Sequence, residues 1–155
     1  ATNLAGVPYG LRCGEIIELL RVALNGEQGI TSNVVATSIK LLKKQNPLVK
    51  MIVSYADSEQ QHLGIIYQAM NFYYVGFSVD SNLIVNGKRE HRRSISGKYG
   101  TNSKDKLEKM GLKVERIVTK PKYKYIYPLD KSLISLCKKL SKPYPKSAEV
   151  AHKGE

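Results

Sequence analysis

Residues 50–79 read KMIVSYADSEQQHLGIIYQAMNFYYVGFSV, a helical pattern between two apolar segments. Lys50–Ala56 is a short apolar run that predicts a central strand. Ser58 followed by Gln61 matches a capping box and predicts that a helix begins there. The apolar stripe of that helix consists of Leu63, Ile66, Tyr67 and Met70. Phe72–Val79 is aromatic and β-branched, which favours a second strand. The order strand–helix–strand decides the fold class.

The segments before this stretch extend the same order. Residues 1–14 are rich in glycine and small residues and read as loop. Glu15–Leu24 is an almost unbroken apolar run whose pattern fits either a buried strand or a helix. Asn33–Gln45 has its apolar residues on one face, and predicts a helix that Ser32 or Asn33 caps.

The segments after it add hairpins and short helices. Asn86-Gly87 is the strongest hairpin signal and joins Leu83–Val85 to a very basic strand or loop, Lys88–Ile95. The other expected elements are a helix at Ser103–Met110, strands at Leu112–Val118 and Lys122–Tyr127, and a last helix capped by Asp130. We predict an α/β (α+β) fold with one mixed sheet flanked by helices, a basic hairpin insertion and a short C-terminal helix.

Length and composition bound the class of protein. A chain of 155 residues most often makes one domain, and we expect one over residues 1–146 with a flexible tail over 147–155. No apolar run approaches a membrane span and no signal peptide opens the chain, which predicts a soluble intracellular protein. Cys13 and Cys137 fit no metal-ligand spacing, and we expect reduced thiols.

The net charge of +12 comes from one half of the chain. Residues 1–87 hold 6 Lys and Arg against 6 Asp and Glu, whereas residues 88–155 hold 19 against 7. A regional bias of this kind favours a surface that binds a polyanion, of which nucleic acid is the commonest. The alternative is a basic surface that only keeps the protein in solution.

Two segments are candidate nucleic-acid contacts. In the basic hairpin the candidates are Lys88, Arg89, His91, Arg92, Arg93, Ser96, Lys98 and Tyr99. Arginine forks and lysines suit phosphates, and small hydroxyls let a backbone come close. In the second segment Lys122, Tyr123, Lys124 and Tyr125 alternate, so that tyrosines could stack an unpaired base while lysines hold its phosphates. The alternative there is a tyrosine face turned into the core.

Polar residues around the first strand are candidate catalytic groups. Asp57 lies where that strand ends, and ligands of open α/β sheets bind beyond the carboxyl ends of strands. His62 and Tyr67 follow in the predicted helix, where solvent exposure and core packing are the respective alternatives. Asp57 alternatively helps to cap that helix. Glu18 lies in an apolar run and either pairs with Arg21 or serves a pocket.

A polar loop precedes the first helix. It contains Gln28, Gly29, Thr31, Ser32 and Asn33. Backbone N–H groups at a helix N-terminus can bind the pyrophosphate of a cofactor, and these residues are the candidates for that role.

A series of short motifs runs through the chain. The specific ones are SYAD at 54–57 and HLGIIYQAMNF at 62–72. The supporting ones are ELLR at 18–21, HRRSIS at 91–96, KYGT at 98–101, KYKYIY at 122–127 and PYPK at 143–146. Together they resemble the phage Mom family of DNA-adenine modification proteins, from about residue 6 to residue 146.

The resemblance implies an N-acetyltransferase-like fold and an enzyme that adds a small acyl-like group to the exocyclic amine of adenine in DNA. That modification shields phage DNA from host restriction enzymes, and implies a location in the cytoplasm of an infected bacterium. On this mapping Glu15–Leu24 becomes a central strand. Asp57, His62 and Ser54 become favoured site residues, Tyr67 takes the place of a general acid, and Glu18 and Asn71 are second-line candidates.

The chain departs from acetyltransferase-like folds at two points. It has no strands and helices before the Glu18 strand, so we expect either a fragment or a reduced fold. Residues 28–33 contain one glycine, where such folds have a glycine-rich acyl-CoA loop. The donor stays open, with an acetyl-CoA-type donor as one candidate.

Two other classes of function remain alternatives. One is a non-catalytic nucleic-acid-binding module, and the other is an N-acetyltransferase that acts on a protein or a small amine.

Overall fold

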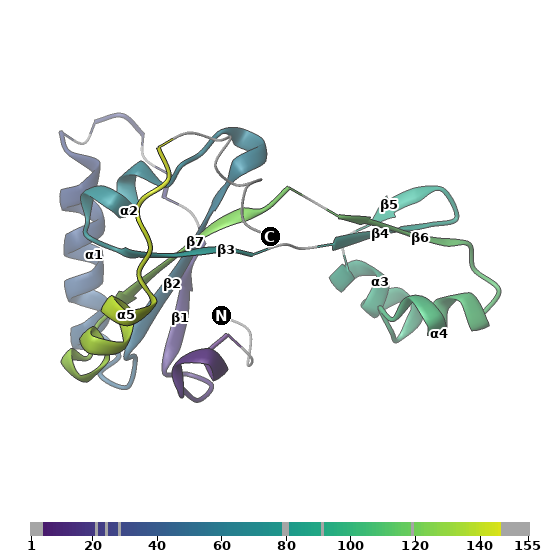
Figure 1. Ribbon diagram of the computed structural model, residues 1–155, viewed down its shortest axis with the longest axis horizontal. Coiled ribbons are helices and arrows are strands. Elements are labelled where there is room, and N and C mark those ends of the chain that lie inside the picture. The colour runs from purple at the N-terminus through teal and green to yellow at the C-terminus, as the bar shows by residue number, and fades with distance from the viewer. Residues whose placement is uncertain are drawn as a thin grey trace. The chain divides into compact units, whose positions relative to one another are not determined.

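The structure, a computed structural model, describes residues 5–20, 22–23, 25–27, 29–78, 81–90, 92–118 and 120–146. The chain divides into two units, each drawn in Figure 1. The main unit contains residues 1–78 and 122–155, and the insert unit contains residues 79–121. Strands and helices are mixed in both units, and the α+β class predicted from the sequence is confirmed.

The main unit is built on a four-stranded mixed sheet. Its order is β1 (Ile16–Leu19), β2 (Met51–Asp57), β7 (Lys122–Pro128), β3 (Tyr73–Ser78). β1 and β2 run parallel and are connected through α1 (Thr31–Gln45), whereas β7 is antiparallel to both of its neighbours. β2 is central, as predicted. The described part of Glu15–Leu24 supplies β1, which lies at the edge of the described sheet and not in its centre.

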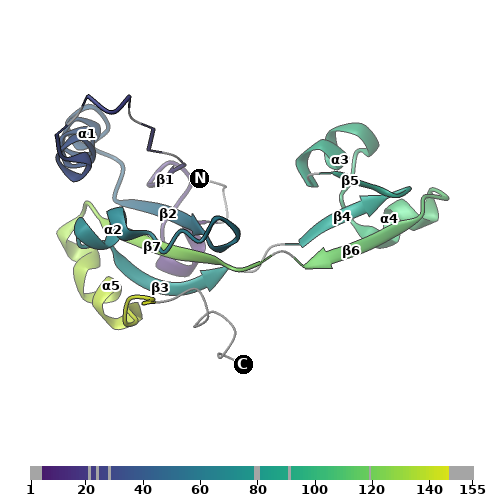
Figure 2. The same ribbon diagram turned by 90° about the horizontal axis from the view of Figure 1, so that it is seen from above.

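Helices cover both faces of this sheet, as Figure 2 shows. Side chains alternate along β2, so that Ile52 and Ala56 pack with α1 in one buried cluster. Met51 and Val53 face the other way, and pack with Tyr9 of a 3-10 turn (η1, Val7–Tyr9) and with α5 (Ile134–Leu140). Asp130 caps the 3-10 turn before α5 (η3, Lys131–Leu133), as predicted, by accepting a hydrogen bond from the Ser132 amide.

The segment after β2 differs from the prediction. Ser58–Gln60 form a 3-10 turn (η2) instead of the first turn of a helix, and the amide of His62 donates to the Asp57 carbonyl. Gly64 has a left-handed backbone (φ 72°), which a helix interior does not allow. The helix α2 therefore begins only at Ile65 and ends at Ala69, and the prediction that a helix begins at Ser58 is wrong.

Three further segments of the main unit refine the prediction. α1 begins at Thr31 with Ile30 at its N-cap, so neither Ser32 nor Asn33 caps it. Residues 141–146 lie alongside the start of β3. The Lys142 amide donates a hydrogen bond to the Tyr74 carbonyl, and the Tyr144 hydroxyl donates one to the Phe72 carbonyl. The tail expected over residues 147–155 lies outside the described residues.

The insert unit has a sheet and a core of its own. β4 (Ser81–Val85) lies between β5 (Lys88–Glu90) and β6 (Val114–Val118), and α3 (Arg92–Tyr99) and α4 (Lys104–Lys109) complete it. The predicted hairpin is confirmed, since Asn86 and Gly87 both have positive φ between β4 and β5. The basic segment continues as α3, so the insertion is larger than a hairpin. Within the described part of the chain, no helix combines the length and the apolar character that a membrane crossing requires.

Candidate functional site

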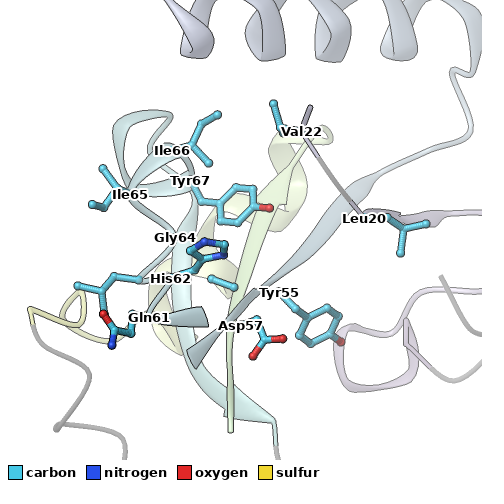
Figure 3. A pocket seen from close by; sticks show the side chains of 12 residues that line it. Leu20, Val22, Tyr55, Asp57, Gln61, His62, Gly64, Ile65, Ile66 and Tyr67 are labelled. Carbon is cyan, nitrogen blue, oxygen red and sulfur yellow. The ribbon is translucent and has the colours of Figure 1, made fainter. Parts of the chain in front are cut away.

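A cavity of about 580 Å³ opens beyond the carboxyl end of β2. Its walls come from the end of β2, from the loop that leads into α2, from α2 itself and from the segment after β1 (Figure 3). The lining residues are Leu20, Val22, Tyr55, Ala56, Asp57, Gln61, His62, Leu63, Gly64, Ile65, Ile66 and Tyr67. Its position is the one that open sheets with parallel strands use for ligands.

Three of the predicted catalytic residues meet at this cavity. Tyr67 is 7% exposed, its ring packs against Phe72 and Tyr125, and its hydroxyl points into the cavity in Figure 3. The side chain of His62 is exposed and lines the same cavity as Tyr67. Asp57 is half-buried at the last position of β2. The cavity therefore combines a phenol, an imidazole and a carboxylate.

Asp57 and Tyr67 approach the cavity from different sides of the sheet. Asp57 stands opposite Lys122 in the ladder of β2 and β7, and Tyr55 stands opposite Lys124. Because side chains alternate along a strand, Asp57 and Tyr55 point to one face of the sheet and Ala56 points to the other. In Figure 3 the Asp57 carboxylate lies toward Tyr55, whereas His62 lies toward Tyr67.

Tyr125 holds the loop that carries His62, a role that the sequence did not indicate. Its buried hydroxyl donates to the Leu63 carbonyl and accepts a hydrogen bond from Gln68 Nε2 at 3.1 Å. Gln68 Nε2 also donates to the Leu63 carbonyl at 3.0 Å. Burial raises the pKa of Tyr125 to about 12, so the hydroxyl keeps its proton at neutral pH. A Cβ on Gly64 would lie 2.5 Å from the Tyr125 ring.

The other predicted catalytic residues do not line the cavity. Ser54 is fully buried, and its hydroxyl donates to the Leu19 carbonyl at 2.7 Å, which ties β2 to β1. Glu18 lies on β1 near Tyr55. The pKa of Tyr55 is raised, mainly by burial; the Lys124 charge opposes this rise and the Glu18 charge adds to it. Arg21, its predicted partner, is outside the described residues.

Two further groups of candidates lie elsewhere on the main unit. Asn71 lines a second cavity of about 450 Å³ together with residues 141–144. Ser32 and Asn33 line a third, of about 260 Å³, with Ala69 and Tyr127. Thr31 begins α1 and Gly29 is exposed in the loop before it, whereas Gln28 lies outside the described residues. Among the described cofactor candidates, Gly29, Thr31, Ser32 and Asn33 are thus absent from the lining of the 580 Å³ cavity.

The basic candidates of the insert unit differ in exposure. Lys88 and Arg89 are exposed on β5, and Lys98 is exposed on α3 with its Nζ 5.0 Å from the centre of the Tyr99 ring. Tyr99 and then Glu90 raise the pKa of Lys98.

The remaining candidates on α3 face inward or are not described. Arg92, Ser96 and Tyr99 are half-buried, on the side of the helix that carries the buried Ile95. The Nε of Arg92 is buried without a hydrogen-bond partner among the described residues. His91 and the side chain of Arg93 are outside them.

The tyrosines of β7 lie in the core of the main unit. Tyr123 and Tyr125 are 1% and 0% exposed, so in this structure neither offers a ring face to a nucleobase. Lys122 and Lys124 are half-buried, and Lys124 Nζ lies 5.0 Å from the centre of the Tyr9 ring. The tyrosine face of β7 is turned into the core, which is the alternative that the sequence left open. The prediction that Tyr123 and Tyr125 stack an unpaired base is therefore wrong for this structure.

A comparison with protein families matches most of the chain. The profile of the Mom protein family matches residues 3–146, a span that includes the whole 580 Å³ cavity and the insert unit. No curated protein matches the chain. Within the described ranges, no three His, Cys, Asp or Glu side chains gather as a metal site would require.

Proposed function

The chain belongs to the Mom protein family, whose members are phage DNA-modification proteins, and from this membership we propose a specific reaction. The protein transfers a small acyl-like group, of the acetamido or carbamoylmethyl type, to the exocyclic amine of adenine in DNA. The modified base protects phage DNA from restriction in the cytoplasm of the host. The observation that supports this proposal most is the convergence of Asp57, His62 and Tyr67 on one cavity.

The three side chains match what the reaction needs. The adenine amine is a weak nucleophile because its lone pair is delocalised into the ring. A bond forms between this nitrogen and the reactive carbon of the donor while the bond from that carbon to the leaving group breaks. His62 or Asp57 accepts the proton that the amine loses, and the Tyr67 hydroxyl donates a proton to the leaving group.

The shape and lining of the cavity suit a nucleobase. A base inside a duplex is out of reach, so the target adenine has to flip out of the stack or be presented on opened DNA. A volume of about 580 Å³ falls in the range of small-molecule sites. Leu20, Val22 and Ile66 add apolar walls beside the Tyr67 ring, against which a planar base can pack.

The main unit is proposed to be an acetyltransferase-like fold. The parallel pair β1 and β2, connected through α1 and ending beside the cavity, supports this assignment. The donor is not assigned, and an acetyl-CoA-type molecule is one candidate. We propose that the donor contacts the backbone N–H groups of the loop before α1. This contact would lie at the separate cavity that Ser32 and Asn33 line.

The test weighs the nucleosides of DNA from cells that express the chain or its variants. We expect a modified adenosine with the wild type, and a loss of about 10²-fold or more with Tyr67→Phe. The same loss with Asp57→Asn would identify Asp57 as the base, and with His62→Gln would identify His62. Asp130→Asn before α5 and Tyr9→Phe on η1 remove the same groups away from the cavity and should leave the yield unchanged.

Each other outcome selects another function. If Tyr67→Phe modifies DNA like the wild type, the phenol is not the acid. DNA binding without any mass change in the nucleosides would identify a non-catalytic binding module. Acyl-CoA turnover that needs no DNA would identify an N-acetyltransferase for a protein or a small amine.

A further inference from the structure

The insert unit has the organisation of a small independent module. Its core consists of Leu83, Val85, Ile95, Leu107 and Val114, with Tyr99 and Leu112 packed against it. Neither of the two core clusters of the main unit contains a described residue of the range 79–121. The chain leaves and rejoins the main unit through neighbouring strands, because Ser78 pairs with Lys122, and Ser81 pairs with Val118 inside the insert.

The surface of this module is rich in cations. Residues 79–121 hold 11 Lys and Arg against 5 Asp and Glu. The acidic side chains in its ion pairs are Glu90, Glu108 and Glu115, whose partners are Lys98, Lys104 and Lys113. Five further cations are exposed and pair with no acidic side chain in the described part of the chain: Lys88, Arg89, Lys106, Lys109 and Arg116.

Two of these cations form a pair on one helix. Lys106 and Lys109 are three residues apart on α4 and therefore lie on the same side of it. The buried Leu107 anchors the opposite side of α4 in the module core, so both amines face solvent. Neither lysine belongs to the hairpin that the sequence singled out.

We propose that residues 79–121 form a discrete module that binds duplex DNA through its phosphates, with Lys106 and Lys109 of α4 among the contacts. The partner rests on the proposed function, because DNA is the substrate of that reaction. Exposed cations without acidic partners release condensed counterions when they meet phosphates, and this release drives binding that is independent of sequence. The module supplies affinity for DNA, and the cavity of the main unit supplies the chemistry.

The test compares two double variants of the full chain. Lys106→Ala/Lys109→Ala removes two charges from the last turn of α4, and Lys138→Ala/Lys139→Ala removes two exposed charges from the last turn of α5 in the main unit. Binding to a random duplex is measured across about 50 to 200 mM salt. The wild type should lose roughly tenfold more affinity over this range than the α4 variant, because two phosphate contacts are gone. The α5 variant should behave like the wild type.

Three results would overturn the proposal. Equal weakening by both double variants would mean that only net charge matters, and an unchanged salt slope in the α4 variant would remove Lys106 and Lys109 from the interface. Weakening toward single-stranded RNA but not toward duplex DNA would identify a different partner. Circular dichroism checks that both variants fold. Lys88→Ala/Arg89→Ala removes two other exposed charges from the module and serves as a second test variant.

A failure of the proposed reaction is distinguishable from a failure of this module. The Tyr67→Phe protein should bind duplex DNA with the wild-type salt slope whether or not it modifies adenine, because Tyr67 belongs to the main unit. If Tyr67→Phe lost DNA binding together with modification, binding would belong to the cavity and the module assignment would be wrong.

Discussion

Gly64 shows how one residue shapes the candidate site. Its backbone is left-handed, and the ring of Tyr125 occupies the place that a side chain would take. We expect Gly64→Ala to lower the free energy of unfolding by about 1–3 kcal/mol, because the ring has to move and the loop that holds His62 moves with it. Chemical denaturation measures the stability, and nucleoside mass spectrometry measures the accompanying loss of modification.

Gly111 is the matched control for this substitution. It also has a positive φ (80°), but nothing lies within 4 Å of the position of a Cβ. Gly111→Ala therefore carries only the backbone strain, about 1 kcal/mol. If the two variants lost the same stability and Gly64→Ala kept full modification, contact with Tyr125 would not shape the cavity.

The sequence singled out three residues that line the cavity and missed Tyr125, which supports the loop that carries His62. Strand-end placement and the Mom-like motifs indicated Asp57, His62 and Tyr67, and these line one cavity. Tyr125 was assigned to base stacking, because alternation along a strand separates two faces without telling which one is covered. In the folded protein α1 and α2 cover the face of the sheet that carries Tyr125. This burial depends on tertiary packing, which the pattern of a single strand does not encode.

At the scale of elements, short sequence signals predicted the structure correctly where they determine the local backbone conformation. Asn86-Gly87 predicted its hairpin because both residues tolerate positive φ, and Asp130 predicted its cap because a carboxylate can accept an amide hydrogen bond. The helix expected from Ser58 does not form, because Gln61 and Gly64 both have a positive φ, which the apolar stripe concealed. The edge position of β1 depends on which strands pair, and no local pattern encodes it.

The Asp130 cap makes part of the stability depend on pH. The backbone amide of Ser132 and then its side chain lower the pKa of the Asp130 carboxyl. A lowered pKa means that the stabilisation is present above the ordinary pKa of aspartate and is lost as pH falls through the lowered value. We expect Asp130→Ala to lower Tm by a few degrees at neutral pH and by less in strong acid, where the neutral carboxyl remains only an uncharged acceptor.

Asp130→Asn separates the charge from the cap. Asparagine also accepts the Ser132 amide hydrogen bond but does not titrate, so its stability should lie between the other two proteins at neutral pH. Thermal melts from neutral to acid pH provide the measurement. A wild-type advantage over Asp130→Ala that stayed constant into strong acid would show that the carboxylate charge contributes nothing.

For the molecule as a whole, the sequence indicated where charge collects but not how the chain is partitioned. The excess of Lys and Arg after residue 88 predicted a polyanion-binding surface, and the hairpin signal located its first strands. The separate core of the insert was not predicted, because Ile95, Leu107 and Val114 are single apolar residues in polar surroundings. They become a core only once β4, β6, α3 and α4 come together.

Separate cores predict separate unfolding. Leu107 is fully buried in the insert, and Leu107→Ala should remove about 2–5 kcal/mol from that core alone. Amides of residues 81–118 should then exchange hydrogen more than about tenfold faster, while those of β2 and β7 keep their protection. Ile126→Ala, equally buried in the main unit, should give the opposite pattern. Hydrogen-exchange mass spectrometry resolves the two regions, and faster exchange in both units with either variant would mean that the chain unfolds as one cooperative unit.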